Sequence, residues 1–98
     1  MLKKVILWHS DGLGGYNAFD VFIKKGTELN EFEREFIEGL YKIQCPFVQK
    51  FLEKYPDYEY LGSEDLYHGI YTFQAEEELH RLYKKGWKKV KACEIGLE

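Results

Sequence analysis

The chain has 98 residues, a length that suits one hydrophobic core and is too short for a second independent module. Apolar residues make up 45% of it and aromatic residues 17%, which argues against a disordered chain. The formal charge of −3 argues against a general nucleic-acid binder. We therefore expect a single α+β domain that spans residues 1–98.

The cysteines and the first residues indicate a compartment. Cys45 and Cys93 form no CxxC pair, so a reduced, cytoplasmic chain is the simplest interpretation. The apolar run at 5–8 is far too short for a signal sequence or a membrane span, and we expect no contact with a membrane. The excess of Lys over Arg, twelve to two, is typical of an AT-rich genome such as that of a bacterium or phage.

Two strands are predicted at the start of the chain. Residues 3–10 carry four consecutive apolar side chains at 5–8, which is typical of a central strand covered on both faces. The glycine-rich residues 11–17 predict a loop. Phe19, Val21 and Ile23 then alternate with more polar residues, which predicts a second strand and a hairpin with the first.

Two helices are predicted next. Asn30 and Glu33 have the spacing of a capping box, and apolar residues at helical spacing extend the first helix from about residue 31 to 43. Pro46 suits the first turn of a second helix, which ends before Pro56. The two helices could form one kinked helix.

The remainder of the chain predicts a second hairpin, a helix and a last strand. Residues 58–62 and 66–73 read as strands joined by a turn at 62–65, and a helix from about Glu76 to Lys85 ends at Gly86. Residues 87–95 favour a strand, with a continued helix as the alternative. The order ββαββαβ predicts a ferredoxin-like split βαβ sandwich with an extra N-terminal hairpin strand and helices on one face.

An aromatic stripe is the predicted binding surface. In the ferredoxin-like arrangement one sheet face has no helices, and the strands carry many aromatic side chains that suit an interface. With the opposite register these rings would pack under the helices. The candidate binding residues are Trp8, Tyr58, Tyr60, Tyr67 and Tyr71.

Charge is distributed unevenly along the chain. Residues 28–38 are mostly acidic, whereas 81–91 form a basic patch. Such runs are usually solvated faces, or faces that pair with each other, and otherwise they bind a charged partner. The basic patch consists of Arg81, Lys84, Lys85, Lys88, Lys89 and Lys91.

The candidate catalytic residues are His9, Asp11 and His68. His9 and Asp11 can share one face at a strand end, where a histidine and a carboxylate suit acid–base chemistry, and His68 could join them to hold a metal. The chain has no HExxH or CxxC motif, so we expect no metal site and no cofactor. Cys45 and Cys93 read as small buried apolar residues.

The segment from His68 to Phe73, followed by an acidic helix start, resembles the third strand and second helix of RNA-recognition motif domains. The resemblance covers about a dozen residues and implies shared fold geometry. Ile70 stands where that family has an aromatic residue, and the partner motif of the first strand is absent.

The sequence favours a binding protein over an enzyme. The leading hypothesis is a small regulatory protein, such as an inhibitor, that docks on a protein partner or forms a homodimer through the aromatic stripe. The second is single-stranded nucleic-acid binding, with rings stacking on bases and the basic patch along phosphates. The third is a small enzyme with a site at His9 and Asp11.

Overall fold

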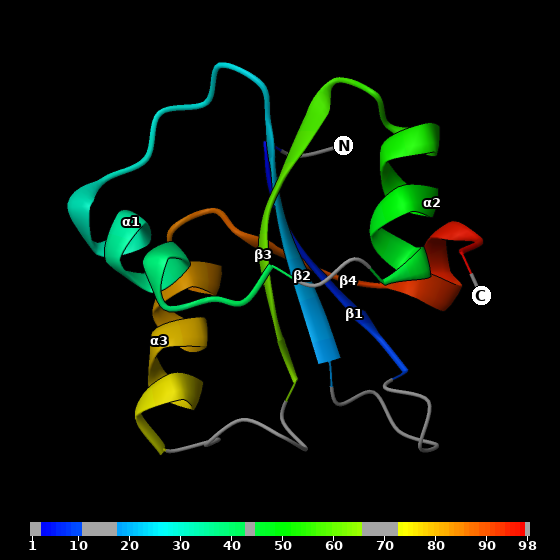
Figure 1. Ribbon diagram of the computed structural model, residues 1–98. Helices are drawn as coiled ribbons and strands as arrows, with labels where there is room; N and C mark the ends of the chain where they lie inside the picture. Colours follow the sequence, from blue (N-terminus) through cyan, green and yellow to red (C-terminus); the bar gives the residue numbers. More distant parts are fainter. Residues whose placement is uncertain (1–2, 11–17, 43–44, 66–72, 98) are drawn as a thin grey trace.

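The computed structural model describes residues 3–10, 18–42, 45–65 and 73–97 (Figure 1). Within these ranges the strands are β1 (Lys4–His9), β2 (Ala18–Lys24), β3 (Tyr58–Asp65) and β4 (Lys88–Lys91). The helices are α1 (Glu31–Glu38), α2 (Pro46–Lys54), α3 (Phe73–Lys84) and the short 3-10 helix η1 (Ala92–Ile95). No helix in these ranges is long and apolar enough to cross a membrane.

The strands form one sheet in the order β3-β2-β1-β4. β1 pairs antiparallel with β2 and parallel with β4, which confirms β1 as a central strand and confirms the first hairpin. The mixed α+β class is confirmed, but the ferredoxin-like order ββαββαβ is not. Of the strand predicted at 66–73, only Phe73 lies in the described part of the chain, and it begins α3.

Helices cover both faces of the sheet, so the prediction of a helix-free face is wrong. Figure 1 shows α1 and α3 on one side of the sheet, and α2 with η1 on the other. The physical reason lies in β1, whose side chains from Val5 to Trp8 are apolar at every position. A strand that is apolar on both faces needs cover on both.

Each face of the sheet has its own core. The core under α2 and η1 consists of Val5, Leu7, Phe22, Val48, Phe51, Tyr58, Val90, Ala92 and Leu97. The core under α1 and α3 consists of Ile6, Trp8, Phe19, Val21, Ile23, Leu79, Leu82 and Trp87. The two lists alternate along β1 and β2, as the two-residue period of a strand requires.

The predicted capping box at the start of α1 is confirmed and also ties α1 to the sheet. The Glu33 backbone N–H donates to Asn30, and the Glu33 carboxylate accepts from the Asn30 backbone N–H. The same carboxylate accepts from Lys4 Nζ at 2.8 Å and from Trp87 Nε1 at 2.5 Å. One buried side chain therefore joins α1, β1 and the segment before β4.

The first helix is shorter than predicted because the chain after it pairs with β3. α1 ends at Glu38, and Tyr41 forms an isolated antiparallel bridge with Ser63. Gly62, predicted to begin a turn, lies within β3 at a φ of 154° beside an irregularity in the β2–β3 register. A Cβ on Gly62 would stand 2.6 Å from Leu40 Cβ, so this glycine permits the close approach of Leu40.

The prediction of a last strand at residues 87–95 is confirmed in part. α3 stops at Lys84, Gly86 has a φ of 99°, and a strand follows instead of a continued helix. That strand is shorter than predicted, because Ala92–Ile95 turn into η1. The turn buries Ala92 and Leu97 against the α2 side of the core.

We predict that Glu33→Ala lowers the free energy of unfolding by about 3 kcal/mol, since it leaves the buried Trp87 N–H without an acceptor and removes the bonds from Lys4 and Asn30. Burial opposes the charged carboxylate, but the bonds from Lys4, Asn30 and Trp87 outweigh it and lower the pKa of Glu33. The stabilisation is therefore present above the pKa of an unfolded glutamate and is lost as the pH falls through the lower folded pKa.

Urea unfolding at neutral pH measures this effect, and Glu35→Ala, at an exposed position of the same helix, is the control. We expect the control to change the unfolding free energy by less than about 0.5 kcal/mol. Equal effects of the two substitutions would contradict the role assigned to Glu33.

Candidate functional site

Four polar side chains are buried in the described part of the chain: His9, Asp20, Glu33 and Ser63. The network at the start of α1 accounts for Glu33. The other three lie together on the α2 side of the sheet, and every buried side-chain nitrogen or oxygen among the described residues has a hydrogen-bond partner. This second polar network is the candidate site.

The register of the first hairpin places His9 beside Asp20. Asp20 in β2 lies opposite Leu7 of β1, and His9 is two residues further along the same face. His9 Nε2 is 2.8 Å from Asp20 Oδ2, with the two side chains 6% and 1% exposed. The sequence thus places a histidine–carboxylate pair inside an apolar layer.

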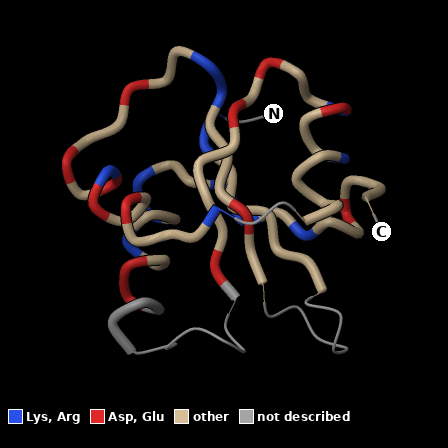
Figure 2. The backbone as a smooth tube through the Cα atoms, viewed as in Figure 1, with Lys and Arg blue, Asp and Glu red and all other residues tan. Residues whose placement is uncertain are grey.

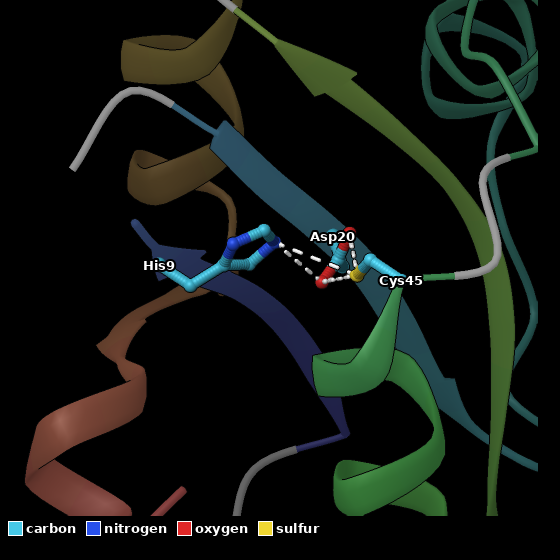
Figure 3. Close-up of side chains that lie close together, drawn as sticks. All are labelled: His9, Asp20 and Cys45. Carbon is cyan, nitrogen blue, oxygen red and sulfur yellow. Dashed lines mark hydrogen bonds and ion pairs between the residues drawn. The ribbon is translucent and has the colours of Figure 1, made fainter. Parts of the chain in front are cut away.

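Cys45 joins this pair from the start of α2 (Figure 3). It is the N-cap residue of the helix, with extended backbone and no side-chain capping bond, and Pro46 occupies the first helical turn. Cys45 Sγ lies 3.5 Å from Asp20 Oδ2, 3.8 Å from Asp20 Oδ1 and 3.9 Å from His9 Nε2. Figure 3 shows the three side chains pointing toward one another from β1, β2 and α2.

Further contacts orient the cluster. His9 Nδ1 is 2.8 Å from the Ser10 carbonyl oxygen, and the His9 ring stacks on Phe47 at 4.4 Å between centroids. The Ser63 hydroxyl donates to Asp20 Oδ1 at 2.5 Å. Tyr60 OH lies 2.5 Å from Ser63 Oγ, so a chain of hydroxyls leads from Tyr60 to the carboxylate.

His9 carries a proton on both nitrogens in this arrangement. Burial opposes the charged ring and is the largest single effect, but bonds to Asp20, Cys45 and the Ser10 carbonyl outweigh it. Together they raise the pKa of His9 to about 10. At neutral pH the pair is an imidazolium and a carboxylate.

This state does not suit a nucleophilic cysteine. A general base must accept the thiol proton, whereas His9 Nε2 is already protonated and directed at Asp20. A bound metal ion would take the place of the proton on Nε2 and would compensate the charges of the Asp20 carboxylate and a coordinated thiolate.

A pocket opens beside Cys45. Its volume is about 870 Å³, and Cys45 is the one member of the cluster that lines it. Tyr60, the outer end of the hydroxyl chain, lines it as well. The other described residues that line it are Lys42, Pro46, Val48, Gln49, Leu52 and Glu53.

The candidate binding residues of the aromatic stripe do not form one surface. Trp8 lies in the core under α1 and α3 with its Nε1 donating to Tyr83, and Tyr58 lies in the core under α2. This burial matches the alternative register, in which the rings pack under helices. Tyr60 is half-buried at the pocket, and Tyr67 and Tyr71 lie outside the described residues.

Of the three candidate catalytic residues, His9 lies in the cluster, while Asp11 and His68 lie outside the described residues. The cluster contains Asp20 and Cys45, which sequence reasoning assigned no role. A signal for Asp20 was available, since it stands between Phe19 and Val21 in a strand that proves to be buried on both faces. Cys45 carried no such signal, because its partners are 25 and 36 residues away.

All six residues of the basic patch are exposed, as expected of a solvated face. Three of them also lie over aromatic rings. The charged ends of Arg81 and Lys85 are about 6 Å from the ring centroid of Phe32, and Lys89 Nζ is 5.4 Å from that of Trp8. Figure 2 shows acidic positions along α1, next to the helix that carries Arg81.

No protein-family model matches the chain, and no curated protein or solved structure shows a significant match to it.

We predict a graded loss of stability along the hydroxyl chain. Ser63→Ala leaves Asp20 Oδ1 with only the weak, distant Cys45 thiol as donor and should cost about 2 kcal/mol, whereas Tyr60→Phe removes only bonds at the outer end and should cost about 1 kcal/mol. Urea unfolding of both variants measures the order. A larger loss for Tyr60→Phe would contradict the assigned direction of the chain.

Proposed function

We propose that this protein binds one Zn²⁺ ion through His9 Nε2, the Asp20 carboxylate and the Cys45 thiolate. The observation that carries the proposal is the convergence of three ligand atoms of different chemistry, all within 4.8 Å of one another, from three separate elements. Nitrogen, oxygen and sulfur ligands of these types are the ones zinc uses in proteins. The thiolate argues against magnesium or calcium, which prefer oxygen ligands.

The separations support a tetrahedral ion. Zinc bonds of ordinary length place such ligand atoms about 3.3–3.6 Å apart. The sulfur–oxygen distance of 3.5 Å falls in this range. The nitrogen–oxygen distance of 2.8 Å is about 0.5 Å below it, and the sulfur–nitrogen distance of 3.9 Å is about 0.3 Å above it. The short nitrogen–oxygen distance follows from the proton that His9 and Asp20 share.

The surrounding contacts also support a metal site. A metal-binding histidine usually donates its other ring N–H to a carbonyl or carboxylate, and His9 Nδ1 has the Ser10 carbonyl as partner. The Asp20 oxygen that faces away from His9 is held by Ser63.

The docking hypothesis has weaker support than the metal site. Trp8 and Tyr58 are enclosed in the two cores. A partner that docks on the aromatic stripe could therefore contact only the other residues of the stripe. The exposed lysines of β4 still support the hypothesis of nucleic-acid binding, but stacking of a base on Trp8 would require that ring to leave the core. Neither hypothesis accounts for the buried cluster.

We predict that the purified protein binds one Co²⁺ per chain and develops the absorption of a thiolate–cobalt bond, with Zn²⁺ displacing the cobalt. Cys45→Ala should abolish the thiolate absorption, because it removes the sulfur ligand. Cys93→Ala is the matched control, since Cys93 is an exposed free cysteine outside the cluster. Loss of the signal in the control, or its persistence in Cys45→Ala, would refute the proposed site.

We also predict that zinc stabilises the fold. The three ligands come from β1, β2 and α2, so only the folded chain presents them together. At a free zinc concentration one hundred times the Kd, the unfolding free energy should rise by about 2.7 kcal/mol. Thermal unfolding with and without zinc measures this gain, which should be absent in Asp20→Ala; an equal gain in that variant would place the ion elsewhere.

A further inference from the structure

The pocket beside Cys45 has features of a ligand site for the proposed metal centre. A zinc ion with three protein ligands keeps a fourth position for water or a ligand. His9 and Asp20 are buried, whereas Cys45 is half-buried and lines the pocket. Access to the fourth position is therefore from the side of Cys45, where the pocket lies.

A second connection links the pocket to the cluster. Tyr60 lines the pocket, and its hydroxyl reaches Asp20 through Ser63. A molecule in the pocket would thus lie between Cys45 on α2 and the start of a hydroxyl chain on β3. Both ends of this arrangement belong to the same polar network.

A cation that lines the pocket favours an anionic ligand. Zn²⁺ with neutral His9 and anionic Asp20 and Cys45 has no net charge. Other charged residues nearby therefore decide whether the pocket prefers an anionic or a cationic ligand. Lys42 Nζ lies 5.5 Å from the Tyr60 ring centroid, donates to the Leu61 carbonyl at 2.7 Å, and has no carboxylate partner among the described residues. Both protein contacts of Lys42 leave its charge uncompensated.

The acidic residue of the pocket lies at its other end. Gln49 and Glu53 follow Cys45 at intervals of four residues on the same helix face, and Glu53 is about 12 Å along the helix axis from Cys45. Glu53 is exposed and accepts a bond from Gln49 at 3.2 Å. The carboxylate therefore repels an anion little at the metal end.

The wall between these ends is apolar. Pro46, Val48 and Leu52 supply it, and a volume of about 870 Å³ accommodates a molecule of eight or so carbon atoms. Each methylene that leaves water there contributes about 0.8 kcal/mol of binding. The pocket combines an anion-binding end with an apolar wall.

We propose that this pocket binds an aliphatic monocarboxylate, with its carboxylate on the metal and beside Lys42 and its chain along Pro46, Val48 and Leu52. This proposal rests on the proposed zinc site. Octanoate is a suitable probe, because it joins a carboxylate to an aliphatic chain that the pocket volume accommodates. Acetate, which lacks the chain, and octylamine, which lacks the coordinating anion, are the matched probes.

The experiment follows the absorption of the cobalt-loaded protein while each probe is added. Octanoate should change the spectrum saturably, with an affinity at least about tenfold higher than that of acetate, and octylamine should leave it unchanged. Lys42→Gln should weaken octanoate about tenfold without changing cobalt affinity. Lys50→Gln, on the same helix as Cys45 but outside the pocket, is the matched control and should leave octanoate binding unchanged.

Each failure has a distinct meaning. A protein that binds cobalt but whose spectrum does not respond to octanoate overturns the carboxylate site and leaves the metal site intact. Equal affinity for octanoate and acetate, or an unchanged affinity in Lys42→Gln, overturns it as well. A protein that binds no cobalt overturns the proposed function and, with it, this inference.

Discussion

Covering β1 and β2 on both faces is the constraint on which the rest of the structure depends. A sheet between two helical layers has no wet face, so any polar side chain on its central strands must find its partners inside the protein. Asp20 of β2 meets this demand under α2, and Glu33 of α1, buried against the other face, meets the same demand from the helical layer. The first network joins elements to one another, whereas the second adds a thiol and opens onto a pocket.

The two networks differ in what their charges can do. Glu33 has a permanent cation, Lys4, and a neutral donor, Trp87, so its charge is compensated by fixed groups. Asp20 is compensated by His9, whose charge depends on a proton that a metal ion can replace. Buried ion pairs seldom add much to stability compared with apolar residues of similar size. The proposed metal site gives this pair, which lies beside a cysteine and a pocket, a role other than stability.

Local signals predicted most of the elements. The apolar run of β1, the Asn30–Glu33 capping box, Pro46 and Gly86 each act within a few residues, and the structure follows all four. The predictions failed where contacts between distant residues decide the local structure. Gly62 was predicted in a turn, but it lies in a strand and permits the approach of Leu40. Tyr41 was predicted in a helix, but it pairs with Ser63 instead. The prediction of the site missed Asp20 and Cys45 for the same reason. Only the folded sheet register places Asp20 beside His9, and only the folded chain places Cys45 beside both residues.

The parallel pairing of β1 with β4 also bears on how the protein is made. Val5 lies opposite Lys88 and Leu7 opposite Val90, so a central strand formed early in the chain has a neighbour that is synthesised more than eighty residues later. A β1–β2 hairpin on its own has both edges open, because β3 and β4 are still missing, and both of its apolar faces lack part of their cover. Sheets with such distant pairings fold slowly, because a long loop must close before the contacts form. The sheet is complete only when residues 88–91 have paired with β1.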